Sequence, residues 1–415
     1  MTYEFDDDEA DVRHASSHPE RDVGTWVLHG DGRPRGERTV APTIPYSATF
    51  VADSADHFAA MATTPRHPSY YTRYGNPIHE RVVALVAGLE GAESGLCFAS
   101  GMAAISSVAL GLLHAGDHVV AQNNHYMGTS MLLTEVLPRL GVTTTLVDQT
   151  STKAFSAAIR PETRLVHIET PANPTLALTD IASVADIAHR AGALLSVDNT
   201  IASPINQRPL SLGADIAIHS ATKILGGHHD ITAGVIVASE ELCAKIWRTS
   251  VVIGATLSPM DAWLLLRGLR TLGVRARQQN DSAMDVANFL AQHPSITRVH
   301  YPGLPDHPQH ELAQRQMDGF GTLIAIEVDG GYTAAERFLS RLRLFTHAVS
   351  LGGVESLAVH AAAMWAGSLD EEQMRAAAIN PSLVRLSIGL ETTHALCTDL
   401  DQALTGLRGL TPDIK

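Results

Sequence analysis

The chain is poor in cysteine, in positive charge and in long apolar runs. Its three cysteines, Cys97, Cys243 and Cys397, lie far apart and form no CxxC pair, which argues against a disulfide framework or a cysteine-based zinc site. The formal net charge of −14 disfavours nucleic acid and anionic membranes as partners, because both need concentrated positive charge. No stretch approaches the roughly 20 apolar residues of a membrane span, and the acidic N-terminus is not a secretory signal. We therefore expect a cytoplasmic protein.

The middle of the chain alternates helical patterns with short apolar runs. The 415 residues exceed one typical core, so two domains or one large α/β unit are expected. Between about residues 76 and 240, strand-like runs include "RLVHIET", "ALLSVDNT", "ADIAIHS" and "AGVIVAS". Runs that are apolar on both faces are typical of a parallel sheet covered by helices. In such sheets, ligands bind beyond the carboxyl ends of the strands.

The two ends of the chain have a different character. A long helical stretch over residues 258–293 leads to "GTLIAIEVDGG", "HAVSLGG" and "LVRLSIGLE", which predict a smaller α+β domain. The first 70 or so residues show little periodicity and predict an arm that packs against a neighbour, preceded by a solvated acidic tail. We expect a tail and arm over residues 1–75, a large domain over 76–274 and a small domain over 275–415.

The stretch "SATKILGGHHD" at residues 220–230 allows two chemistries. In one, His228, His229 and Asp230 bind a metal beside an ordinary lysine. Adjacent histidines point in different directions on most backbones, and only one further ligand lies nearby, so we expect no metal site. In the other, Lys223 is the reactive group. It follows the predicted strand "DIAIHS" and should therefore lie at the ligand-binding edge of the sheet.

Lys223 has neighbours that suit a phosphorylated cofactor. The hydroxyls of Ser220 and Thr222 could donate to a phosphate, and a lysine beside a phosphate site suits a Schiff base with pyridoxal phosphate (PLP). Similar strings also occur on protein surfaces. Asp198 in "LLSVDNT" ends another predicted strand at the same edge. An aspartate there could pair with a protonated pyridine nitrogen, or it could cap a turn.

Two further strings are compatible with the same cofactor. Ser100, Gly101 and Met102 in "FASGMAAI" precede a helical pattern, and the amides at a helix start bind phosphate well. Small residues could equally serve a plain helix entry. Tyr126 in "NNHYMGT" follows the strand-like run "HVVAQ", where its ring could stack on a cofactor.

Together these residues resemble the Cys/Met-metabolism family of PLP enzymes, which includes cystathionine γ-synthases and γ-lyases, methionine γ-lyases and acylhomoserine sulfhydrylases. The resemblance runs from about residue 40 to 405. It implies PLP-dependent transferase fold type I, an α/β fold with a mostly parallel central sheet, a smaller α+β C-terminal domain and an extended N-terminal arm. The matching strings are "YYTRYGNP", "FASGMAAI", "ETPANPT", "VDNT", "RPLSLGADIAIHSATK", "GATLSPMDAWLLLRGLRTL", "HYPGL", "SLGGVESL" and "VRLSIGLE".

The resemblance implies a role for each matching residue. Lys223 would form the Schiff base and move protons, Asp198 would pair with the pyridine nitrogen, and Tyr126 would stack on the ring. Asn173 would contact the cofactor's phenolic oxygen or the substrate carboxylate. The expected phosphate ligands are Ser100, Gly101, Met102, Ser220 and Thr222, together with Tyr71 and Arg73 of the neighbouring subunit.

The substrate would be a small amino acid, with its carboxylate bound by Arg385 near Ser350 and Val349. Family members are typically homotetramers built as dimers of dimers. The implied reactions pass through a vinylglycine-type quinonoid intermediate. They are γ-replacement on an activated homoserine or similar amino acid, which we favour, and γ-elimination to a 2-oxo acid and ammonia. A member that binds PLP without catalysis is a third possibility, which the presence of Lys223, Asp198, Tyr126 and Arg385 disfavours.

Several positions depart from the family pattern. Cystathionine-handling members usually carry glutamate where this chain has Val349, and methionine γ-lyases usually carry cysteine at Gly128. Methionine γ-lyases also carry a Lys-Asp pair where this chain has Ser250 and Val251. The usual proline and Thr-His pair after "SLGG" are replaced here by Ala361, Trp365 and Ala366. An aromatic residue there would reshape the mouth of the substrate site, so a non-standard substrate is possible.

Overall fold

The computed structural model describes residues 23–32, 37–367, 374, 379–405 and 407. The predicted acidic tail lies outside these residues. In the described part, the larger sheet has the strand order β1-β7-β6-β5-β4-β2-β3 and the smaller one β10-β11-β12-β9-β8. The strands of the larger sheet are β1 Ser94–Phe98, β2 His118–Gln122, β3 Thr143–Val147, β4 Thr163–Glu169, β5 Leu194–Asp198, β6 Ile216–His219 and β7 Gly234–Ala238. Those of the smaller sheet are β8 Ile296–His300, β9 Leu323–Val328, β10 Thr346–His347, β11 Leu357–His360 and β12 Leu383–Ser387.

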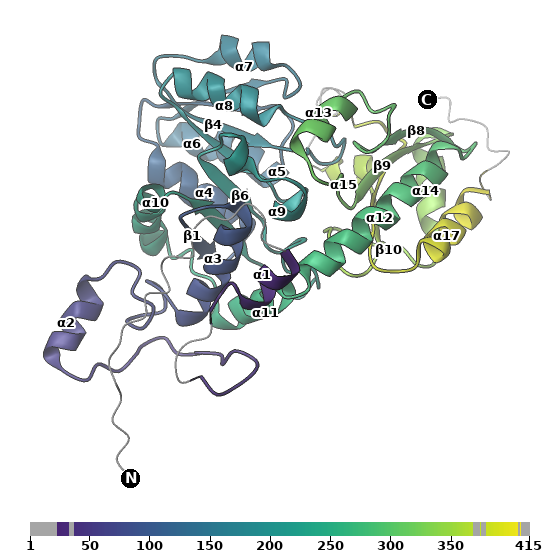
Figure 1. Ribbon diagram of the computed structural model, residues 1–415. Coiled ribbons are helices and arrows are strands. Elements are labelled where there is room, and N and C mark those ends of the chain that lie inside the picture. The colour runs from purple at the N-terminus through teal and green to yellow at the C-terminus, as the bar shows by residue number, and fades with distance from the viewer. Residues whose placement is uncertain (1–22, 33–36, 368–373, 375–378, 406, 408–415) are drawn as a thin grey trace.

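Helices cover both faces of the larger sheet (Figure 1). On β7, Val235 and Val237 join one apolar cluster, and Ile236 and Ala238 join another. This alternation follows from the period of two along a strand. Helices of the large domain are α3 Pro77–Glu90, α4 Gly101–Leu112, α5 Met127–Met131, α6 Leu137–Arg139, α7 Thr152–Ala158, α8 Ile181–Arg190, α9 Ser203–Asn206, α10 Glu240–Ile253 and α11 Pro259–Leu269, with the π-helical turn η1 Leu132–Val136 and the 3-10 turn η2 Pro209–Leu212.

The sheet is mostly parallel, as expected, but β7 runs antiparallel to both β1 and β6. The chain between β6 and β7 contains no crossover helix, and a parallel connection would need one. The apolar run "AGVIVAS" cannot reveal this direction, because a strand buried on both faces reads the same either way. Strand β1 was not predicted, and it extends the sheet beyond β7.

Helix α12, Leu272–Ala291, connects the two parts of the chain (Figure 1). Leu272 packs in the core of the larger sheet, whereas Ala283 and Leu290 pack in the core beneath the smaller sheet. The predicted helical stretch over 258–293 is therefore two helices, because α11 ends at Leu269 before a turn at Arg270 and Thr271. The remaining C-terminal helices are α13 His310–Gln316, α14 Gly331–Arg341, α15 Ala361–Trp365 and α17 Thr393–Thr405.

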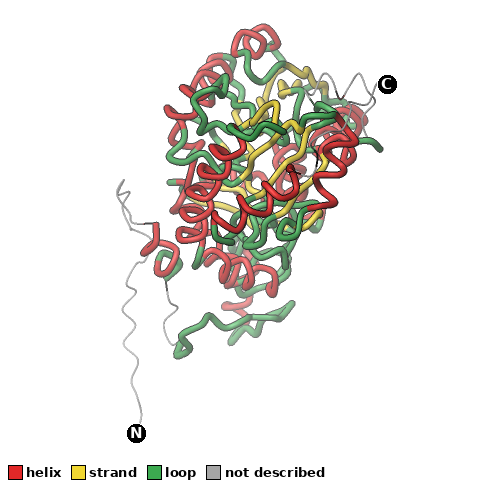
Figure 2. The backbone as a smooth tube through the Cα atoms, turned by 90° about the vertical axis from the view of Figure 1, so that its right-hand side faces the viewer, coloured by secondary structure: helices red, strands yellow, loops and turns green. Residues whose placement is uncertain are grey.

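The N-terminal segment has two parts with different surroundings. Helix α1, Val23–His29, lies against the large domain, where Trp26 Nε1 donates to Leu85 O at 3.0 Å. Farther along, helix α2, Ala55–Thr63, and its flanking loops project away from the body in both views (Figures 1 and 2). Among the described residues, no helix combines the length and apolar character needed to cross a bilayer.

A buried carboxylate fixes the end of α1. Asp31 has a side chain that is 2% exposed and accepts from Arg81 Nε at 2.7 Å and from Arg270 NH2 at 2.7 Å. Arg270 NH1 also donates to Val27 O at 2.7 Å. The three side chains join α1 to α3 and to the residue that follows α11.

We predict that Asp31→Ala destabilises the protein by about 3 kcal/mol, because Arg270 loses its buried carboxylate partner and Arg81 keeps only Glu37. The measurement is denaturant unfolding followed by fluorescence. Asp53→Ala is the control, since Asp53 is 92% exposed in its ion pair with His57. Equal unfolding curves for the two variants would contradict the prediction.

Candidate active site

The carboxyl ends of β5 and β6 meet at one edge of the larger sheet. Asp198, the last residue of β5, pairs in register with Ile218 of β6. Beyond β6, Ser220 N donates to Thr200 Oγ1 at 2.7 Å, and Thr200 Oγ1 donates to Asp198. The turn then continues to Lys223, whose N–H donates to Ser220 O at 3.0 Å. Residues far apart in the sequence are thus joined by a short chain of hydrogen bonds.

Lys223 is a partly buried amine beside the small domain. Its Nζ donates to Ser350 Oγ at 3.0 Å. Burial, with a smaller contribution from the charge of Arg385, lowers the pKa of Lys223 to about 8. A fraction of the amine is therefore neutral near pH 7.5, and only the neutral amine is a nucleophile or a proton acceptor.

Arg385 lies in the middle of β12 and is buried. Its NH1 donates to Asn173 Oδ1 at 3.0 Å and its NH2 donates to Ser350 O at 2.6 Å. Its Nε has no partner among the described residues. Burial lowers the pKa of Arg385 to about 10, so the group remains a cation near neutral pH. Ser350 therefore contacts both Lys223 and Arg385.

The start of α4 forms a narrow cradle beside Ser220. Ser100 caps the helix, and its hydroxyl accepts from Ala103 N at 3.0 Å. A Cβ at Gly101 would lie 2.7 Å from Ser220 Cβ, so only glycine allows this approach. The first amides of a helix have no intrahelical partner and attract anions. Thr222 is less available, because its hydroxyl accepts from Ala233 N and donates to Ala233 O.

Tyr126 is half-exposed and precedes α5. A Cβ at Gly128 would lie 2.9 Å from Tyr126 Cε1 and 2.8 Å from Met102 Sδ. These distances place the tyrosine ring and Met102, from the first turn of α4, both close to Gly128. The predicted stacking residue therefore lies near the α4 cradle.

Asp198 has a second carboxyl as its neighbour. Glu169, the last residue of β4, pairs in register with Asp198, and both side chains are buried. Burial and the charge of Asp198 raise the pKa of Glu169 to about 8, and burial raises the pKa of Asp198. The sequence reasoning singled out neither Glu169 nor Thr200. The available signal was a polar residue at or just beyond the end of a buried strand.

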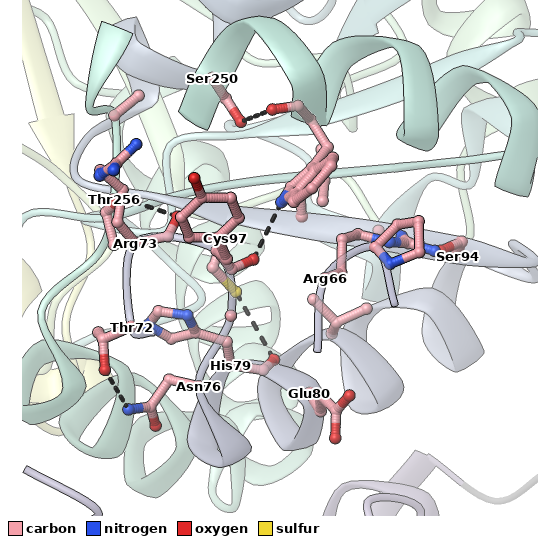
Figure 3. A pocket seen from close by; sticks show the side chains of 18 of the residues that line it. Arg66, Thr72, Arg73, Asn76, His79, Glu80, Ser94, Cys97, Ser250 and Thr256 are labelled. Carbon is pink, nitrogen blue, oxygen red and sulfur yellow. Dashed lines mark hydrogen bonds between the residues drawn. The ribbon is translucent and has the colours of Figure 1, made fainter. Parts of the chain in front are cut away.

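Tyr71 and Arg73 lie in a different place. Arg73 NH1 donates to Val251 O at 2.9 Å, and its guanidinium lies over the rings of Tyr71 and Tyr74. Arg73 lines a cavity of about 560 Å³ between the start of α3, β1 and α10 (Figure 3). None of Lys223, Asp198 and Arg385 lines this cavity.

His228 and His229, the candidate metal ligands beside Lys223, do not form a cluster. His228 Nδ1 lies 2.8 Å from Gly226 O, and His229 Nε2 lies 4.0 Å from Glu355. No group of three potential metal ligands is present in the part of the chain that the structure describes.

Comparison with known proteins identifies the family. The family model described as Cys/Met metabolism PLP-dependent enzyme matches residues 24–405. The chain belongs to this family. It is 42% identical to cystathionine gamma-lyase of Bacillus subtilis over 92% of this chain and 99% of the relative. It is 43% identical to L-methionine gamma-lyase of Pseudomonas putida over 91% of this chain and 96% of the relative.

Solved structures agree with this assignment. The crystal structure of metB from Corynebacterium glutamicum matches with a TM-score of 0.87 and 39% identity, covering 94% of this chain and 99% of the other. The match confirms the expected fold type, and family membership makes the chain a PLP-dependent enzyme of the γ-lyase and γ-synthase group.

The residues present fit PLP. The α4 cradle offers amides and a hydroxyl for a phosphate, Asp198 offers a carboxylate for a ring nitrogen, and Lys223 offers an amine of lowered pKa for the aldehyde. The unpartnered Nε of Arg385 leaves a donor for a substrate carboxylate.

We predict that cofactor attachment to the apoprotein accelerates as the pH rises through about 8, because the neutral fraction of Lys223 increases with pH. The measurement is the rate at which the absorbance of lysine-bound PLP appears between pH 6 and pH 9. Lys223→Ala should abolish this absorbance and lower kcat by about 10³-fold or more. A rate independent of pH, or a lysine-bound absorbance in Lys223→Ala, would contradict the prediction.

Proposed function

We propose that the enzyme catalyses γ-replacement on an activated homoserine or another γ-substituted amino acid. The observation that carries this proposal is the shared contact at Ser350. Its hydroxyl accepts from Lys223, and its carbonyl accepts from Arg385. A group that moves protons and a group that binds a carboxylate are thus adjacent, as reactions at the Cα and Cβ of one amino acid require.

Each residue has a definite task in this scheme. PLP, when bound, supplies the electron sink for removal of the α-proton. Lys223 takes that proton and delivers protons to neighbouring carbons, which its pKa of about 8 permits in both directions. Arg385 holds the substrate carboxylate, with Asn173 fixing the guanidinium plane. Asp198 keeps the proton on the ring nitrogen, and Tyr126 covers the ring.

Further proposed contacts hold the phosphate and line the substrate side. The amides of Gly101 and Met102 and the hydroxyls of Ser100 and Ser220 bind phosphate at the α4 cradle. Thr222 supports the turn, because its hydroxyl donates to Ala233 O and accepts from Ala233 N.

Two positions disfavour cystathionine and methionine as substrates, and so favour replacement over a dedicated lyase reaction. Val349 is 72% exposed and precedes Ser350 in the chain. It places an uncharged side chain where cystathionine-handling members of the family usually carry a glutamate. At Gly128, a cysteine side chain of the kind usual in methionine γ-lyases would require Met102 or Tyr126 to move, because a Cβ there lies under 3.0 Å from both.

Trp365 acts less directly than the sequence suggests. The side chain is buried in a cluster with Ala361, Ile379 and Leu383, and Met127 of α5 packs against that cluster. Met127 follows Tyr126 in the chain. We infer that Trp365 shapes the substrate site through α5 rather than by lining an open mouth.

The second candidate is γ-elimination, which the names of the Bacillus subtilis and Pseudomonas putida relatives favour. The same lysine, aspartate and arginine serve both outcomes. The two outcomes differ in whether a nucleophile or a proton adds at Cγ, and water hydrolyses the released product in the second case. These three residues alone therefore do not separate them.

We predict that O-acetylhomoserine or O-succinylhomoserine, offered with a thiol, yields a thioether adduct faster than 2-oxobutyrate, because Val349 and Gly128 depart from the residues usual in the cystathionine- and methionine-handling members of the family. Mass spectrometry of reactions with these two substrates, methionine and S-adenosylmethionine, with and without thiol, makes the measurement. Lys223→Ala should give neither product. Equal 2-oxobutyrate formation with and without thiol, in the absence of any adduct, would contradict the proposal of γ-replacement and show that the reaction is γ-elimination.

We further propose a homotetramer built as a dimer of dimers, in which Tyr71 and Arg73 bind the phosphate at the partner's site. Their separation from Lys223 in one chain supports this arrangement. Exposed apolar side chains on the arm support it too, because isolated chains rarely display so many near one another. They are Val40, Tyr46, Val51 and Phe58.

We predict that mixing two inactive variants, Lys223→Ala and Arg73→Ala, restores about a quarter of wild-type activity when subunits exchange at random in equal amounts. Half of the dimers would be mixed, and each would hold one site with both residues intact. The measurement is activity after co-refolding of the two variants. If Arg73 acts within its own subunit, no mixed dimer has an intact site and activity stays absent.

A further inference from the structure

Glu169 occupies the strand end beside the proposed ring-nitrogen partner. Residues opposite each other on adjacent parallel strands direct their side chains to the same face of the sheet, and Glu169 is paired in this way with Asp198. Glu169 is 5% exposed. A buried carboxyl next to another carboxyl is costly, so it needs a compensating function or strong partners.

The two oxygens of Glu169 join two loops of the site. Oε2 accepts from the backbone N–H of Tyr126 at 2.8 Å, and Oε1 accepts from the backbone N–H of Asn173 at 3.3 Å. Tyr126 begins the α5 segment, and Asn173 holds Arg385 through its side chain. One carboxyl therefore connects the ring-covering residue and the residue that orients the carboxylate clamp.

The backbone of Glu169 is itself held in place. Gln122 Nε2 donates to Glu169 O at 2.9 Å, and Glu169 N donates to Gln122 Oε1 at 2.9 Å. Gln122 is the last residue of β2, so the contact fixes the end of β4 against its neighbouring strand. A side chain fixed at its own backbone can transmit position to the groups that it contacts.

We propose that Glu169 is a positioning residue that sets Tyr126 and Asn173 relative to Asp198, and that it shares with Asp198 the charge facing the cofactor's ring nitrogen. This inference rests on the roles proposed above for Tyr126, Asn173 and Asp198. It assigns Glu169 no direct contact with substrate.

The charge of the pair supports the inference. In the protein without cofactor, burial and Asp198 raise the pKa of Glu169 to about 8, so Glu169 holds a proton at neutral pH. A protonated ring nitrogen at Asp198 would offset the like charges and lower the pKa of Glu169. Binding of PLP should then release the proton of Glu169.

The test compares Glu169→Gln and Glu169→Ala with wild type. We expect both variants to bind PLP and to lose about 100-fold in kcat/KM for the best substrate of the panel above, because the ring cover and the clamp are displaced. We also expect a weaker visible circular dichroism signal from bound PLP. At pH 7, wild type should release about one proton more per subunit than Glu169→Gln when PLP binds, as calorimetry in buffers of different ionisation enthalpy measures.

Glu327→Gln is the matched control. Glu327 is a partly buried carboxyl on β9 that pairs with His300 at 2.8 Å and accepts from Asn380 at 3.0 Å, and neither partner belongs to the proposed site. Its replacement should leave the dichroism and the proton release unchanged.

Unchanged kcat/KM and dichroism in both Glu169 variants would overturn the inference, as would equal proton release in wild type and Glu169→Gln. A loss of activity accompanied only by a lower melting temperature would assign Glu169 a structural role and overturn it as well. The proposed function fails separately, if Lys223→Ala remains active on the same substrates.

Discussion

The parallel register of β4, β5 and β6 is the constraint on which the site depends. It brings the ends of three strands to one edge, so that Glu169, Asp198 and the turn to Lys223 lie together although they come from distant parts of the chain. The groups at this edge are buried, and burial moves the pKa of each toward neutrality. The carboxyl pKa values rise and the lysine pKa falls, so proton exchange near pH 7 follows from the fold itself.

The small domain completes the site through one unusual residue. Ser350 has φ of 90°, a conformation that residues other than glycine rarely adopt. In this conformation its hydroxyl faces Lys223 while its carbonyl faces Arg385. Arg385 also reaches Asn173 in the large domain. The strained backbone is therefore stabilised by contacts to both domains, and the relative position of the domains fixes the distance between the amine of Lys223 and the guanidinium of Arg385.

Part of this site could be predicted from the sequence because it follows strand and helix ends. Asp198 and Lys223 lie where an apolar run stops and Ser100 lies where a helical pattern begins, and the structure has Asp198 at the end of β5, Lys223 in the turn after β6 and Ser100 as the N-cap of α4. Arg385 lies in mid-strand, where no local pattern distinguishes it, and only the family motif indicated it. Glu169 was missed because its importance comes from amide contacts across β2, β4 and the Asn173 loop. The direction of β7 was hidden because burial on both faces removes the alternation that marks an antiparallel strand.

The N-terminal segment divides into a part that stabilises its own subunit and a part that does not. Up to Glu37, its polar groups pair with arginines of the large domain, as the contacts of Asp31 and Glu37 with Arg81 show. Beyond this point the segment presents apolar side chains to solvent, including Val40 and Val51 at 92% and 89% exposure. An extended chain with such side chains gains little from folding alone, since few apolar contacts offset the entropy of ordering it. The buried Asp31 anchor therefore holds the start of the arm on its own subunit, while the remainder depends for its stability on the second copy of the oligomer proposed above.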